Sequence, residues 1–70
     1  MKYAVVIEKS DTGYAAYAPD LPGVGVTADT PAEARTLIRE AIALHLQGLR
    51  EDNDPIPNPT AEIDYIETAA

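Results

Sequence analysis

Residues 29–33 contain the strongest local signal in the chain, the start of a helix. Thr30 stands at the N-cap position, Pro31 at the first helical position and Glu33 at the third. This pattern is a capping box, and proline is tolerated at the first helical position because its missing N–H has no intrahelical partner to lose. We therefore predict a helix over residues 31–50, where apolar residues recur at helical spacing.

The apolar side chains of this helix cover more of its circumference than packing on one sheet face needs. On a helical wheel they fill an arc of roughly 200°, about twice what one sheet face covers. A chain of 70 residues without cysteine buries only about 60% of its unfolded surface, and oligomerisation is a usual remedy. We therefore predict a homodimer or a larger homo-oligomer, with a helix interface formed by Ile42, His45, Leu46 and Leu49.

Three segments before the helix have the composition of β-strands, bounded by turn residues. They are residues 2–9, 14–18 and 24–28. The turn between the first two is short enough to make them an antiparallel hairpin, and Gly13 is available there for a positive φ. Leu21 stands between two prolines in the next loop, so we expect its side chain to point inward.

A fourth strand is predicted at residues 61–67, where Ile63 and Tyr65 alternate with Glu62 and Asp64. Prolines at every second position from 55 to 59 keep the preceding connection extended and stiff. A right-handed crossover makes this strand parallel to the first. The predicted fold is α+β: one β-β-β-α-β domain, with a mixed four-stranded sheet in the order 3-2-1-4 and one helix on one face.

The charge balance narrows the classes of partner. The chain has 5 Lys+Arg against 12 Asp+Glu, a net charge of −7, whereas nucleic-acid binding draws on basic residues that neutralise phosphates. We predict no direct nucleic-acid partner and no membrane partner. The net negative charge favours binding to a basic protein partner, and it is equally explained by the need to keep the chain soluble. No apolar run approaches the ~20 residues of a membrane span, and the N-terminal run is too short for a signal peptide, so we expect a cytoplasmic protein.

Candidate catalytic groups are few. His45 is the only histidine and falls near the centre of the helix's apolar arc, so a core or interface imidazole is favoured over a general base or a metal ligand. The glycines match neither a P-loop nor a dinucleotide-binding fingerprint. The carboxylates that could form a metal cluster lie on different elements and are Glu8, Asp11, Asp20 and Asp29. We predict no enzyme, no cofactor and no metal site; a metal-dependent nuclease is the weakest alternative.

Several segments of the sequence resemble the HicB-like antitoxin family. The similarity covers about residues 1–60 and is carried by KYAVVIEKSDTGYAAYAPDLPGV, the helix start TADTPAEA, and AIALHLQGLREDNDPIPNPT. It implies a partial ribonuclease H-like domain that acts as the antitoxin of a type II toxin–antitoxin system. The implied partner is HicA, a small basic messenger-RNA interferase, which the antitoxin neutralises by covering its catalytic surface. The alternative is an orphan oligomeric interaction module of the same fold, without a toxin.

Members of that family often carry a C-terminal helix-turn-helix or ribbon-helix-helix domain that binds operator DNA. This sequence ends at Ala70, and we predict a single domain over residues 1–70 with no such domain. The sheet edge and the loop at residues 19–23 are the predicted surfaces for the toxin. The predicted contact residues are Tyr14, Tyr17, Asp20 and Leu21, since tyrosine is enriched in interface hot spots.

Overall fold

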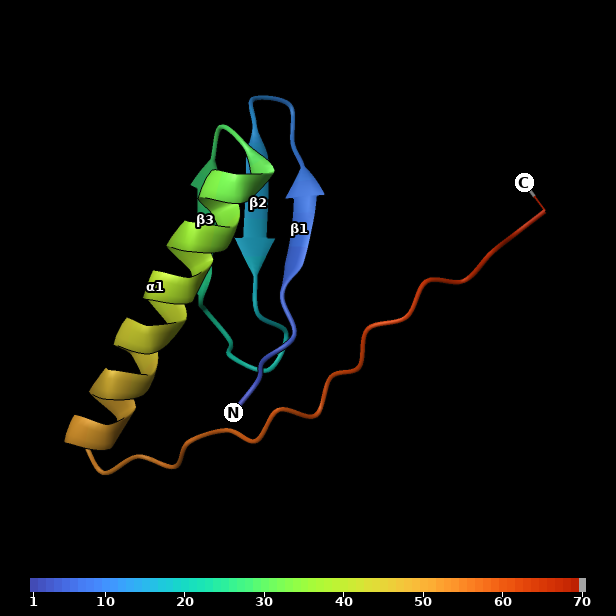
Figure 1. The fold of residues 1–70 in the computed structure, drawn as a ribbon. Helices are drawn as coiled ribbons and strands as arrows, with labels where there is room; N and C mark the ends of the chain where they lie inside the picture. The colour runs from blue at the N-terminus through green and yellow to red at the C-terminus, as the bar shows by residue number, and fades with distance from the viewer. Residues whose placement is uncertain (70) are drawn as a thin grey trace.

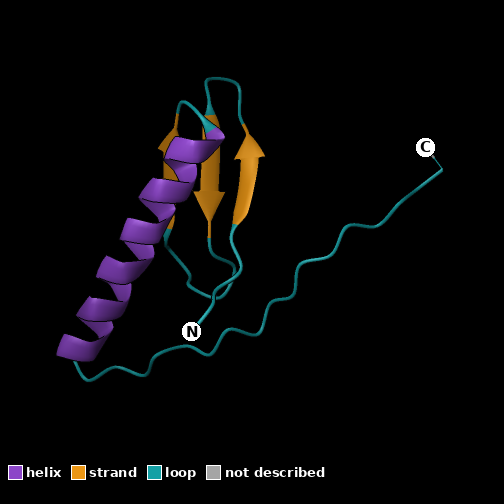
Figure 2. Cartoon of the chain, in the orientation of Figure 1, coloured by secondary structure: helices purple, strands orange, loops and turns teal. Residues whose placement is uncertain are grey.

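The computed structural model describes residues 1–69 and contains three strands followed by one helix. The elements are β1 (Val6–Lys9), β2 (Tyr14–Tyr17), β3 (Gly25–Ala28) and α1 (Pro31–Glu51). The sheet is antiparallel throughout, in the order β1-β2-β3. The helix lies across one face of it and packs against all three strands (Figures 1 and 2).

The register of the strands sorts their side chains onto two faces. Ile7, Ala16 and Val26 stand opposite one another in the three strands and belong to the hydrophobic core beneath α1. Alternate side chains point the other way, where no second layer covers the sheet in the described part of the chain. This open face of the sheet consists of two rows, Val6–Tyr17–Gly25 and Glu8–Ala15–Thr27.

The buried core is small and joins the sheet, the β2–β3 loop and the first half of α1. Its members are Ala16, Ala18, Leu21, Val24, Ala34 and Ile38. The predicted inward position of Leu21 is confirmed, because this side chain is only 1% exposed. Gly23 completes that loop with a φ of 83°, a backbone conformation that glycine adopts without steric cost.

The predicted helix start is confirmed. The Glu33 amide donates a hydrogen bond of 3.1 Å to the Thr30 hydroxyl oxygen, and Pro31 opens the helix. The helix ends at Glu51, one residue beyond the prediction. Beyond it, Asn53 takes a left-handed φ of 57°, and the amide of Asp54 donates to the carbonyl oxygen of Leu49 at 2.8 Å. This is a Schellman motif, which satisfies carbonyls that the helix end leaves free.

The hairpin of β1 and β2 is also confirmed, but Gly13 is needed there for a different reason. Its φ is not positive. A Cβ atom at Gly13 would instead lie 2.4 Å from the carbonyl oxygen of Ala28, so the absence of a side chain lets the hairpin turn approach the end of β3.

The prediction of a fourth strand at residues 61–67 is wrong. The sheet has three antiparallel strands, not four strands in the mixed order 3-2-1-4, and the likeness to ribonuclease H is not confirmed. Residues 55–69, here named the C-terminal tail, are extended but pair with no strand. The prolines keep the chain straight past the base of the sheet, so it does not turn back along β1.

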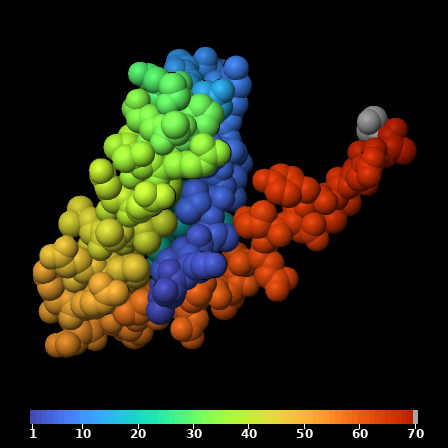
Figure 3. Space-filling view, viewed as in Figure 1, coloured from blue at the N-terminus to red at the C-terminus, as the bar shows by residue number. Residues whose placement is uncertain are grey.

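The tail also changes the overall dimensions. The Cα radius of gyration is 13.7 Å, whereas a compact domain of this length has about 11 Å. Figure 3 shows why: the last residues leave the body of the molecule and project away from it. The described chain therefore consists of a packed body, residues 1–54, and a tail that contacts the body over only part of its length.

Candidate protein-binding surfaces

The two tyrosines of β2 lie on opposite faces of the sheet, as the strand period requires. Tyr14 packs against the core on the helix side. Tyr17 is 41% exposed on the open face. Its neighbours there include Ala15, Gly25 and Thr27, whose small side chains leave a shallow hollow beside the ring. Of these two tyrosines, Tyr17 is thus the one whose ring is exposed.

Asp20 holds the C-terminal tail against the β2–β3 loop. Its carboxylate accepts hydrogen bonds of 3.0 Å from the Thr60 amide, the Thr60 hydroxyl and the Ala61 amide. The bond from Ala61, followed by those from Thr60, lowers the pKa of Asp20, and partial desolvation opposes that shift. This predicted contact residue therefore already has partners within its own chain.

Leu21, the fourth predicted contact residue, is buried beneath the same loop. The Leu21 amide donates to the carbonyl oxygen of Ala18 at 3.0 Å, and the Val24 amide donates to that of Leu21 at 3.1 Å. These bonds and the buried side chain set the shape of the loop, so the Leu21 side chain is not part of the molecular surface.

A second anchor for the tail was not predicted. The Tyr3 hydroxyl donates a hydrogen bond to the carbonyl oxygen of Pro57. The residues are 54 positions apart in the sequence, and nothing in the local pattern around either one signals the pairing.

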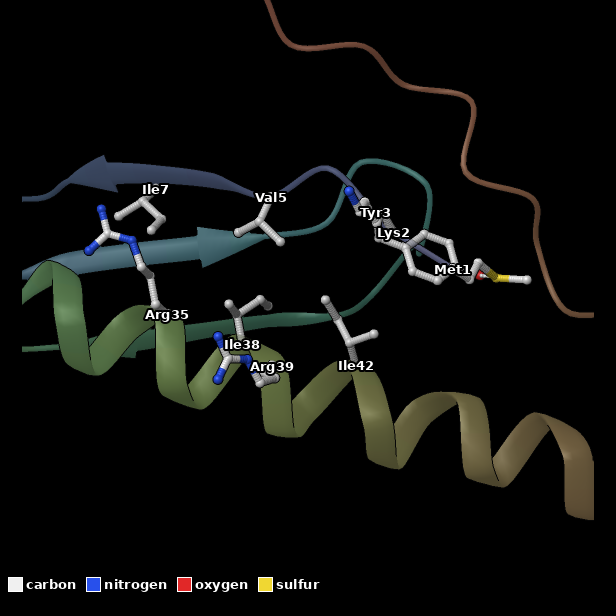
Figure 4. Close-up of a pocket in the computed structure, with 9 residues that line it drawn as sticks. All are labelled: Met1, Lys2, Tyr3, Val5, Ile7, Arg35, Ile38, Arg39 and Ile42. Atoms are coloured by element: carbon white, nitrogen blue, oxygen red, sulfur yellow. Dashed lines mark hydrogen bonds between the residues drawn. The ribbon is translucent and has the colours of Figure 1, made fainter.

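An open groove of about 600 Å³ runs between the N-terminal segment with β1 and the helix α1 (Figure 4). Four apolar side chains form its floor: Val5, Ile7, Ile38 and Ile42. Its other lining residues include three cations, Lys2, Arg35 and Arg39. Three of the five Lys and Arg residues of this acidic chain therefore line one groove.

The predicted helix interface lies in the second half of α1. Ile42, His45, Leu46 and Leu49 are all half-buried, and Ile42 and Leu46 pack against the core cluster. The two fully buried residues of α1, Ala34 and Ile38, both lie in its first half. The second half extends beyond the end of the sheet (Figure 1), and Leu44 there is 71% exposed.

Residues 1–69 contain no group of three or more histidine or acidic side chains placed to hold a metal ion. The four carboxylates considered from the sequence do not come together as ligands, and Asp20 is engaged with the tail. No helix in the described part of the chain is long and apolar enough to cross a membrane.

Curated relatives cover nearly all of this chain. It is 38% identical over 66 residues to a 14.9 kDa protein from the rep-hol intergenic region of Haemophilus phage HP1, covering 94% of this chain and 50% of that protein. A UPF0150 protein of Thermoplasma acidophilum is 40% identical over 63 residues, 89% of this chain and 91% of that protein. Antitoxin HicB 2 of Photorhabdus laumondii is 32% identical over 62 residues, 89% of this chain and 45% of that protein. The chain thus spans half the length of the phage protein and less than half the length of the antitoxin.

Two solved structures also match the fold of this chain. A chain of the HicA3 and HicB3 toxin–antitoxin complex superimposes with a TM-score of 0.72 at 30% identity, over 86% of this chain and 70% of that chain. The antitoxin HicB3 crystal structure gives a TM-score of 0.70 at 30% identity, over 86% of this chain and 44% of that chain. The sequence model described as the HicB-like antitoxin of bacterial toxin–antitoxin systems matches residues 3–70. The chain belongs to the HicB-like antitoxin family.

Proposed function

We propose that this chain is the antitoxin of a type II toxin–antitoxin system and neutralises a small basic HicA-like messenger-RNA interferase in the cytoplasm by direct binding. The observation that carries the proposal is the family match over residues 3–70. The 30% identical fold in the HicA3 and HicB3 complex supports the kind of partner. An antitoxin acts by binding, which agrees with the prediction that the chain is not an enzyme.

The open face of the sheet is the surface that we assign to the toxin. Tyr17 is its exposed ring, and a half-exposed tyrosine beside a shallow hollow is a typical interface anchor. Glu8 lies in the adjoining row of the same face and is exposed, so it offers a carboxylate to a basic partner. Asp20 and Leu21 act through the loop whose shape they set, and Tyr14 supports β2 from the core side.

We also propose that the chain self-associates through the second half of α1. An exposed leucine and several half-buried apolar side chains lie there, beyond the end of the sheet. The predicted interface residues Ile42, His45, Leu46 and Leu49 belong to this stretch. A small domain gains buried apolar surface by pairing such stretches.

The experiment starts from the host genome and lysate. The tagged chain is used to recover a small basic protein, and that protein is then tested for cleavage of messenger RNA with and without stoichiometric antitoxin. Binding in stoichiometric yield together with inhibition of cleavage is the expected result. If the recovered protein cleaves no RNA, or cleaves it equally well with the antitoxin present, the antitoxin function is refuted and the orphan interaction module replaces it.

Point variants then test the assigned surface. Tyr17→Ala is expected to weaken toxin binding about 30-fold, the change that a 2 kcal/mol hot spot gives. Leu44→Ala removes a more exposed apolar side chain, 71% against 41%, from α1 and should leave toxin affinity unchanged. Circular dichroism checks that both variants fold. Equal affinity for the wild type and the Tyr17 variant would move the toxin surface away from the open face.

A further inference from the structure

We propose that the last residues of the C-terminal tail, residues 62–69, dock in the groove between β1 and α1 of a second copy of the chain, so that two copies exchange tails. The inference rests on the proposed self-association: the tail and the groove, whose lining includes Ile42 of the helix interface, supply the contact without which the two copies separate. It does not depend on whether the chain binds a toxin.

The tail carries apolar side chains that its own chain leaves in water. Ile63 is 55% exposed, Tyr65 92% and Ile66 77%. They make up half of the large hydrophobic side chains exposed in the described chain. Concentrated exposure of this kind marks an interaction site rather than ordinary surface.

The groove has the opposite charge to the tail. Lys2, Arg35 and Arg39 line it, whereas the tail segment carries Glu62, Asp64 and Glu67 and no basic residue. In a chain with a net charge of −7, this groove is the place where an acidic segment meets attraction instead of repulsion.

The spacing of side chains along the tail also matches the spacing of side chains along the groove. In an extended chain, residues two apart repeat about every 6.6 Å and point to the same side. On a helix, residues four apart repeat about every 6 Å. Ile63 and Tyr65 therefore match the spacing of Ile38 and Ile42 in the groove floor. By the same arithmetic, Glu62 and Asp64 match the spacing of the two arginines of α1.

The tail docks in the groove of a second copy, because its path leads away from the groove of its own chain. Asp20 holds Thr60 and Ala61 at the β2–β3 loop. From there residues 62–69 run outward from the body (Figures 1 and 3). Eight extended residues reach about 26 Å, which is more than twice the roughly 10 Å that α1 rises between Arg35 and Ile42. A tail of this length can cross to a neighbouring molecule and still fill the groove.

Charge reversal provides the test. One double variant, Arg35→Glu with Arg39→Glu, reverses the groove; the other, Glu62→Lys with Asp64→Lys, reverses the tail. Light scattering after gel filtration should give at least twice the 7.5 kDa of one chain for the wild type and a single-chain mass for either variant alone. When the two variants are mixed, both grooves again face tails of opposite charge, so the doubled mass should return.

A control carries Lys9→Glu, a charge reversal outside both the groove and the second half of α1, and should keep the wild-type mass. Circular dichroism checks that every variant is folded. If the wild type has a single-chain mass, both self-association and tail exchange are refuted. If the groove and tail variants keep the wild-type mass, or if the mixture stays at the single-chain mass, tail exchange is refuted. If the groove and tail variants keep the wild-type mass, the second half of α1 remains as the interface.

Discussion

The body of the chain and its C-terminal tail are held in different ways. The body, residues 1–54, is held by apolar side chains that meet between the sheet and α1, with Leu21, Ala34 and Ile38 at most 3% exposed. The tail is held to the body by a few hydrogen bonds to two side chains, Tyr3 and Asp20. Packing of this kind is lost cooperatively, whereas single hydrogen bonds are lost one at a time. A change in the body should therefore affect the whole molecule, and a change at an anchor should affect only the tail.

The largest expected effect is a cavity in the body. Ile38→Ala removes a side chain that is 3% exposed in the centre of the core. Such truncations cost about 2–5 kcal/mol, a large part of the stability of a domain this small. Urea unfolding followed by circular dichroism measures the loss. Glu40→Ala, at an exposed position of the same helix outside the groove and the proposed helix interface, is the control and should change stability by less than about 0.5 kcal/mol. Equal effects of the two variants would contradict this account of the core.

Two glycines give the next contrast. At Gly13 an added Cβ would meet the carbonyl oxygen of Ala28 at 2.4 Å, so Gly13→Ala should destabilise the body by about 1–3 kcal/mol. At Gly48, within α1, nothing lies within 4 Å of an added Cβ. Gly48→Ala should therefore stabilise the helix by about 0.5–1 kcal/mol. Thermal unfolding of both variants checks the opposite signs, and a Gly13→Ala variant at least as stable as the wild type would show that the hairpin turn does not need its close approach.

The division between body and tail also separates the features that the sequence predicted from those that it did not. The helix start was predicted because the Thr30 side chain caps the backbone amide of Glu33, only three residues away. The inward position of Leu21 followed from its place between two prolines. The anchors of the tail join Tyr3 to Pro57 and Asp20 to Thr60, 54 and 40 positions apart, and no local pattern encodes such pairs.

The wrong prediction at residues 61–67 has a related cause. Alternation of apolar and acidic residues shows which side chains share a face, but a strand also needs a partner edge, and the pattern does not specify one. The groove was missed for a similar reason. Lys2, Arg35 and Arg39 look dispersed along the sequence, and only the packing of α1 beside β1 brings them to one place.

A smaller and local effect is expected at the tail anchor. Asp20→Asn replaces the carboxylate that accepts bonds from Thr60 and Ala61 with a weaker, neutral acceptor. The amide hydrogens of Thr60 and Ala61 should exchange faster with solvent, while those of β2 and α1 keep their protection. Hydrogen exchange followed by NMR measures both. Asp11→Asn, an exposed carboxylate in the hairpin turn, is the control. Faster exchange throughout the body would show that the tail and the body unfold together.

Low pH should also release the tail, because it protonates the carboxylate of Asp20 that accepts these hydrogen bonds. The hydrogen bonds from Ala61 and Thr60 lower the pKa of Asp20 below its ordinary value of 3.8. A carboxyl whose pKa is lower in the bound state than in the free state favours the bound state above its ordinary pKa. That contribution is lost as the pH falls through the lowered value. The anchor should thus be intact at neutral pH and should open only below pH 3.8.

The chemical shifts of the Thr60 and Ala61 amides report this titration directly. In the wild type they should move together with a midpoint below 3.8, because the carboxylate that they bond becomes protonated there. In the Asp20→Asn variant the group that titrates is absent, so the movement should vanish while other carboxyls titrate as before. A wild-type midpoint at or above 3.8 would mean that the amides do not stabilise the charged carboxylate in solution. The tail would then be free at Asp20, and the division between a packed body and an anchored tail would rest on Tyr3 alone.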